Sequence, residues 1–168
     1  AEFCYRGKHI GNRCMSTGCC SLRTGYCGKR TLINHISFMI ERDFLMRQLK
    51  QLFAVLQEII RHRRKGDFIR AAEEIQFFYS SLKIEDDIRS LSIAEMMTIL
   101  IDKKEFTGEQ LELIAFVLKE QGEMERDAAV RRELFGKAFF ILSKVEQESM
   151  TFSMDRLMKI GELKEYLS

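Results

Sequence analysis

Apolar side chains recur every three or four positions from Arg42 to Lys65, which is the spacing of one face of an α-helix. The repeating positions are Leu45, Leu49, Leu52, Leu56 and Ile59, and Phe53 and Ile60 widen the stripe. The pattern predicts a long helix with one buried face. The same stripe also fits a coiled-coil seam, so dimerisation through this helix is an open alternative.

Gly66 and Asp67 are expected to end this helix and to begin the next one. Glycine readily takes the left-handed conformation that follows a helix C-terminus, and an aspartate side chain accepts hydrogen bonds from the first free amides of a helix. A second helix is predicted from about Phe68 to Lys83. Its inward face is expected to comprise Phe68, Ala72, Ile75, Tyr79 and Leu82.

Two capping boxes predict the starts of the third and fourth helices. Ser92 precedes Glu95 by three residues, and Thr107 precedes Gln110 by the same interval. At this spacing each side chain accepts a hydrogen bond from an amide that the helix leaves unpaired. The inward residues are expected to be Ile93, Met96, Met97, Leu100 and Ile101 in the third helix, and Leu111, Ile114, Val117 and Leu118 in the fourth.

The last part of the chain predicts a fifth helix and a short terminal one. The apolar positions of the fifth are Leu134, Phe135, Ala138, Ile141, Leu142 and Val145, and those of the terminal helix are Leu157, Ile160 and Leu167. Ser153 is expected to cap the terminal helix. No strand-like alternation occurs in residues 39–168. The predicted fold is therefore all-α, with five to six helices arranged as antiparallel hairpins.

Two segments are similar to parts of a tetratricopeptide repeat. Residues 66–71 match the turn between its helices, where glycine makes the turn and alanine allows close packing, and residues 134–138 match the later part of its second helix. Val55 and Ile59 stand where the repeat has a large aromatic and a small residue. We expect a tetratricopeptide-like array of hairpins rather than a true tandem repeat.

A further resemblance begins at residues 42–49, which read Arg-Asp-Phe-Leu-Met-Arg-Gln-Leu. They are followed by the Gly-Asp-Phe turn at residues 66–68, a helix rich in Leu and Met, and a late helix containing Ala138. This order resembles a family of small uncharacterised bacterial proteins that carry a domain of unknown function. The resemblance covers about residues 39–149, and it implies a tetratricopeptide-like fold but no activity.

Residues 1–38 differ in composition from the rest of the chain. Residues 1–38 contain six of the 27 Lys and Arg residues and one of the 25 Asp and Glu residues. Residues 39–168 therefore contain the other 21 basic and 24 acidic residues. The sequence therefore predicts a basic leader, 1–38, and a mildly acidic helical domain, 39–168. Met39 is a plausible start for the second part, so we expect the leader to be extraneous or poorly ordered. The run from Thr31 to Ile36 fits either a strand or a backward extension of the first helix.

The leader contains every cysteine of the chain, namely Cys4, Cys14, Cys19, Cys20 and Cys27. Three interpretations are open: a segment outside the evolved domain, a small disulfide-linked element, and a zinc site that recruits His9 and His35. The number of cysteines is odd, and no Cys-x-x-Cys pair is present, which disfavours the last two interpretations.

The helical domain offers little for catalysis. Its single histidine, His62, lies four residues after Glu58, and we expect this pair to be solvent-exposed. The Glu-x-x-His motif of di-iron bundles, glycine-rich phosphate loops and calcium-loop spacings do not occur. The sequence predicts a protein that is not an enzyme and that holds no cofactor or metal.

Two surface features are candidates for binding. One is the basic cluster Arg61, His62, Arg63, Arg64 and Lys65, which either contacts an acidic partner or balances the negative C-terminal end of the first helix. The other is a pair of aromatics, Phe77 and Phe140, which exceed what one helix face needs to fill a core. They either cover a second layer of helices or reach a groove of a partner.

The function that these features favour is a helical scaffold for protein–protein interaction or self-association, including a homodimer. The alternative is a nucleic-acid-associated regulator that uses residues 61–65, although the acidic balance of residues 39–168 makes nucleic acid the less favoured partner. The longest apolar run, residues 113–118, is far below the length of a membrane span. A cysteine-free helical domain with a methionine-rich core favours a cytoplasmic location.

Overall fold

The computed structural model describes the backbone of residues 29–168 and the side chains of residues 42–168. Six α-helices and one π-helical segment make up its regular structure, and no strand occurs in this range. In order they are α1 (Lys29–Arg64), α2 (Phe68–Ser81), α3 (Ile93–Met97), the π-helical η1 (Thr98–Lys103), α4 (Gly108–Met124), α5 (Ala128–Glu148) and α6 (Met154–Leu167). The prediction of an all-α chain with five to six helices is confirmed for these residues.

Helix α1 begins at Lys29, so the run from Thr31 to Ile36 extends the helix backwards and is not a strand. Residues Met39–Ser168 form one structural unit. The predictions for Cys4, Cys14, Cys19, Cys20 and Cys27 lie outside the described residues.

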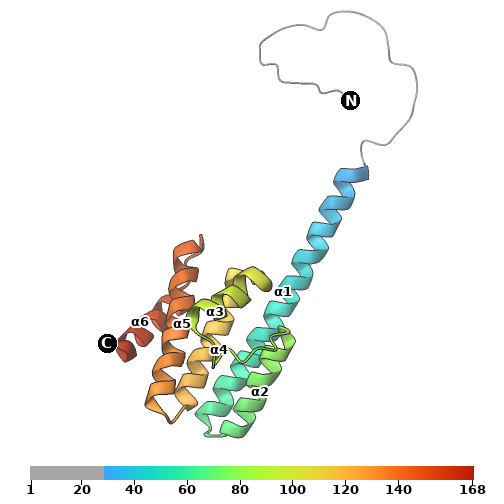
Figure 1. The fold of residues 1–168 in the computed structure, drawn as a ribbon. Helices are drawn as coiled ribbons and strands as arrows, with labels where there is room; N and C mark the ends of the chain where they lie inside the picture. Colours follow the sequence, from blue (N-terminus) through green and yellow to red (C-terminus); the bar gives the residue numbers. More distant parts are fainter. Residues whose placement is uncertain (1–28) are drawn as a thin grey trace, which may run out of the picture. The chain divides into compact units, whose positions relative to one another are not determined.

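The turn between α1 and α2 forms as the sequence predicts. Gly66 has a φ of +77°, a left-handed conformation that costs glycine little because it has no Cβ. The Asp67 side chain then accepts a hydrogen bond of 3.3 Å from the Arg70 amide and caps α2. As a result α1 and α2 run antiparallel, as do α4 and α5 (Figure 1).

The inward face of α2 differs from the prediction. Ala71, Ile75, Phe78 and Leu82 are buried, whereas Phe68 and Ala72 are exposed and Tyr79 is half-buried. Apolar residues lie on both possible faces of this helix, so periodicity alone does not distinguish them. Packing against the neighbouring helices selects the face that carries Phe78.

Both capping boxes are present, at Ser92 with Glu95 and at Thr107 with Gln110. The expected inward face of the third helix is correct only in part. Met96 and Leu100 are buried and Met97 and Ile101 are half-buried, but Ile93 is exposed and Ile99 is buried instead. The reason is that α3 continues directly into η1, whose wider turn shifts the angular position of the residues that follow.

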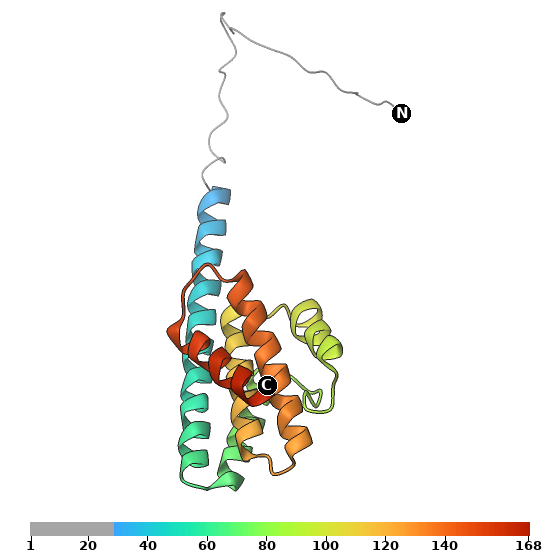
Figure 2. The same ribbon diagram turned by 90° about the vertical axis from the view of Figure 1, so that its left-hand side faces the viewer.

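Helix α4 is the central helix of the unit (Figure 2). Every residue from Leu111 to Gly122 is buried except Glu112 and Phe116, which are half-buried. Its buried polar side chains bond to α1, α2 and α6. The pairs are Gln110 with Gln48 of α1, Glu120 with Arg63 of α1, Gln121 with Tyr79 of α2, and Lys119 with Glu162 of α6. These partners satisfy groups whose burial would otherwise be costly.

Helix α5 packs along α4, and α6 lies across α5 (Figure 2). The predicted inward residues of the fourth and fifth helices are all buried. In α6 the Ser153 cap is confirmed, since its hydroxyl accepts a hydrogen bond of 3.3 Å from the Arg156 amide. Leu157, expected inside, is partly exposed, and Leu163 is the leucine that α6 buries. Within residues 29–168, no helix combines the length and apolar character that crossing a membrane requires.

Candidate functional site

The basic cluster at the end of α1 does not form one continuous cationic surface. The Arg61 guanidinium donates to Glu58 over 2.7 Å, and Arg63 turns inward and pairs with Glu120 of α4. Among the described residues only Arg64 and Lys65 of this cluster form no ion pair and stay exposed. The charge available to a partner is therefore smaller than the sequence suggests.

The prediction that His62 is solvent-exposed is wrong, because the last turn of α1 packs its ring against the core. Its Nε2 lies 3.8 Å from a Glu58 oxygen and its Nδ1 lies 3.7 Å from an Asp67 oxygen, both too far for a hydrogen bond. Nδ1 has no hydrogen-bond partner. Within the part of the chain that the structure describes, no group of three metal-ligating side chains is assembled.

Phe77 and Phe140 are both exposed, on α2 and α5 respectively. Phe140 lines a shallow apolar groove of about 550 Å³ together with Ile93 and Met97 of α3 and Ile101 of η1. Phe77 stands 57% exposed on the outer side of α2. The two phenylalanines therefore belong to different surfaces and do not form one site.

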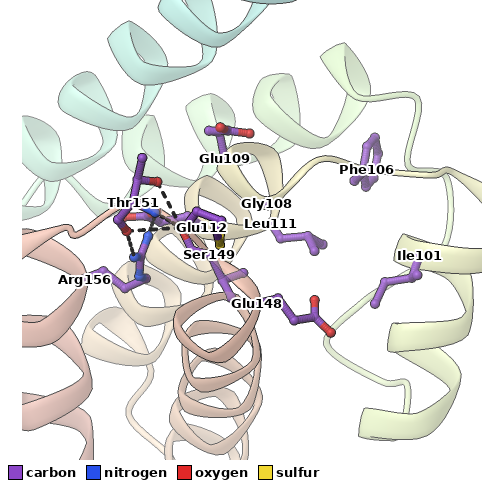
Figure 3. A pocket seen from close by; sticks show the side chains of 12 residues that line it. Ile101, Phe106, Gly108, Glu109, Leu111, Glu112, Glu148, Ser149, Thr151 and Arg156 are labelled. Atoms are coloured by element: carbon purple, nitrogen blue, oxygen red, sulfur yellow. Dashed lines mark hydrogen bonds and ion pairs between the residues drawn. The ribbon is translucent and has the colours of Figure 1, made fainter.

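A second pocket, of about 430 Å³, lies between the start of α4 and the connection from α5 to α6 (Figure 3). Its charged lining residues are Glu109, Glu112, Glu148 and Arg156. The three guanidinium nitrogens of Arg156 donate to Glu146 (2.5 Å), Glu112 (2.8 Å) and the Thr151 carbonyl (2.7 Å). Burial alone would lower the pKa of Arg156, but the two carboxylates outweigh burial and raise it. Arg156 is thus engaged in holding α6 in place, and we assign this pocket a structural role.

The third surface is an apolar groove of about 390 Å³ between α1 and α4, which we call the α1–α4 groove. Its apolar lining is Met46, Leu49, Phe53, Leu113 and Phe116, and its polar lining is Lys50, Glu109, Glu112 and Asp155. Phe53 was expected to widen the buried stripe of α1, but 53% of its surface is exposed. Met46 is exposed as well, so two large apolar side chains of α1 project beside the groove.

The charges around the α1–α4 groove are mainly negative. Glu109 in the first turn of α4 and Asp155 in the first turn of α6 are exposed and form no ion pair among the described residues. Glu112 is already paired with Arg156, and Lys50 is the one cation among the lining residues. The groove therefore combines an apolar floor with a rim on which acid predominates.

The sequence does not predict this groove, because residues of three helices line it. The available signal was the spacing of Met46, Leu49 and Phe53, which continues the apolar stripe of α1 beyond the width that the core needs. The contribution of Leu113 and Phe116 depends on how α4 lies beside α1, which a helical period does not report.

Comparisons of the chain with protein-family models, with curated proteins and with solved structures gave no match. The class of protein is therefore defined by the fold alone, as an all-helical unit in residues 39–168. Its surface presents apolar grooves whose lining includes exposed apolar side chains.

Proposed function

We propose that this protein is a non-enzymatic helical scaffold that binds another protein chain through the α1–α4 groove. The observation that carries the proposal is the exposure of Phe53 and Met46 beside a concave apolar surface. Large apolar side chains that gather at a hollow on a surface are typical of protein-binding sites. The groove runs from Met46 to Phe53, or about 10 Å along α1, which suits the apolar side chains of one or two helical turns of a partner.

The arrangement of antiparallel hairpins supports this role, because such hairpins build concave surfaces between their helices. As part of the same proposal, we retain the relation to the family of small bacterial tetratricopeptide-like proteins and the cytoplasmic location. Binding through the groove requires no catalytic group, cofactor or metal.

A photo-cross-linking amino acid at the exposed Lys50 tests the proposal, since this position lines the groove. We expect a discrete cross-linked adduct in cells that contain the protein, and we expect Phe53→Glu to reduce it severalfold because a carboxylate on the apolar wall opposes docking. The matched control is Phe77→Glu, which replaces an equally exposed phenylalanine outside the groove. Circular dichroism checks that both variants remain folded.

The proposal would be contradicted if the protein labelled at Lys50 gave the same adduct yield with and without Phe53→Glu. Loss of the adduct in both Phe53→Glu and Phe77→Glu would also contradict it, since that result indicates a surface other than the groove.

The nucleic-acid alternative receives less support, because Arg61 and Arg63 are engaged by Glu58 and Glu120. If residues 61–65 did bind phosphates, binding to single-stranded RNA would weaken with salt and with Arg64→Ala and Lys65→Ala together. Filter binding at two salt concentrations measures this directly.

A further inference from the structure

The exposed turn between α1 and α2 carries apolar and basic side chains, whereas the α1–α4 groove has a mainly acidic rim. We call residues 64–70 the α1–α2 corner. Ile69 is 76% exposed at its tip, and the neighbouring Phe68 is exposed as well. Arg64, Lys65 and Arg70 flank these two residues along the chain, and all three are exposed. The corner is therefore a projecting apolar tip with basic flanks.

The charges of the corner and of the groove complement one another. Arg64 and Lys65 form no ion pair among the described residues, and the corner's one carboxylate, Asp67, lies 3.4 Å from Arg70. On the groove the exposed carboxylates are Glu109 and Asp155, and Lys50 is the one cation of the lining. A net positive tip thus matches a net negative rim, with a single opposite charge on each side.

The corner and the groove also share no residue, so each copy of the chain offers both surfaces at once. On α1 the groove ends at Phe53 and the corner begins at Arg64, eleven residues or about 16 Å further along the helix. A corner therefore does not fill the groove of its own chain, since the rigid helix that joins them holds the two apart.

From this complementarity we infer that the groove is occupied by the α1–α2 corner of a second copy of this chain. Ile69 and Phe68 of one copy enter the apolar groove beside Phe53 of the other. Arg64 and Lys65 then face Glu109 and Asp155. This inference rests on the proposed function, because it names the partner of the same groove.

The first test is the concentration dependence of the mass by sedimentation and light scattering. The intact chain is expected to self-associate. Ile69→Asp is expected to raise the Kd of self-association by roughly tenfold or more, as loss of a central apolar anchor does. Phe77→Asp is the matched control, because it places the same charge on an exposed apolar site of the same helix outside the corner. Association is also expected to weaken as salt rises, since exposed charges are screened.

The second test reverses charges on each surface separately. Arg64→Glu with Lys65→Glu makes the corner acidic, and Glu109→Lys with Asp155→Lys makes the rim basic. Each double variant is expected to be monomeric alone, because its corner and its rim then carry the same sign of charge. An equimolar mixture is expected to associate, because it restores opposite charges at both contacts. Since Glu109 and Asp155 also lie at helix N-termini, Glu109→Gln with Asp155→Asn provides a milder second variant.

A monomeric intact chain, or self-association that Ile69→Asp leaves unchanged, would overturn the inference. Association of either charge-reversed variant alone to the level of the intact chain would also overturn it. The Lys50 cross-link separates this failure from failure of the proposed function. An adduct with a different protein that Phe53→Glu abolishes supports the groove but rejects the second copy, whereas an adduct of twice the chain mass supports both.

Discussion

Gly122 shows how a single missing side chain sets the distance between two helices. A Cβ added at Gly122 of α4 would lie 2.6 Å from Cδ1 of Phe135 on α5, far inside van der Waals contact. The ring cannot easily move, because Phe135 is buried and its centroid lies 5.0 Å from that of Tyr166 on α6. Gly122 therefore allows α4, α5 and α6 to pack together.

Gly122→Ala is expected to lower the free energy of unfolding by about 1–3 kcal/mol, the usual cost of overpacking a core. Gly161→Ala in α6 is the matched control, since no atom lies within 4 Å of a Cβ there. We expect that control to stabilise the protein by about 0.5–1 kcal/mol because alanine favours helix more than glycine does. Urea denaturation of both variants measures the difference. An equal effect of the two substitutions would contradict the close approach.

At the scale of the element, the caps determine where short helices begin. Helix α3 has five residues, too few to be stable without help from outside the helix. Ser92 supplies part of that help, since its hydroxyl accepts a hydrogen bond from the Glu95 amide while the Glu95 carboxylate accepts one of 3.0 Å from the Ser92 amide.

Ser92→Ala is expected to cost about 1 kcal/mol of stability, which is typical of losing an N-cap. Ser80→Ala, at an exposed position in the last turn of α2, serves as the control and is expected to change stability by less than about 0.5 kcal/mol. Thermal unfolding followed by circular dichroism compares the two. If Ser80→Ala costs as much as Ser92→Ala, the capping box does not stabilise α3.

At the scale of the whole molecule, three carboxylates make stability depend on pH. Hydrogen bonds from the Ser92 hydroxyl and amide lower the pKa of Glu95, and the amides of Asp127 and Arg126 lower that of Glu125. Burial would raise the pKa of Glu162, but its hydrogen bonds with Lys119 and Lys159 outweigh burial and lower it. A carboxylate whose pKa falls on folding binds protons more weakly in the native state than in the unfolded state.

These carboxylates contribute stability above the unfolded pKa of Glu, near 4.5, and the contribution is lost as the pH falls through their lower folded pKa values. We therefore expect the free energy of unfolding in urea to be smaller at about pH 3 than at pH 7. Glu125→Gln is expected to reduce this difference, and Glu73→Gln, which removes an exposed carboxylate on α2 without an ion pair among the described residues, is the control. Stability that does not change between the two pH values would refute the expectation.

The features that could be predicted from the sequence depend on residues within about four positions of one another. They include the helical periods, the two capping boxes, and the turn at Gly66 and Asp67. Such features follow from the period of 3.6 residues and from backbone groups that only a near neighbour can satisfy.

By itself, then, the sequence determined which residues form helices and where most of those helices start and stop, because these choices are local. The tertiary structure alone decided that α2 buries Phe78 rather than Phe68, that Arg63 pairs with Glu120 57 positions away, and that Phe53 lies beside a groove. The physical reason is that an apolar stripe reports only that some face is buried. The surface that covers it, and the part left uncovered, depend on helices distant in the chain.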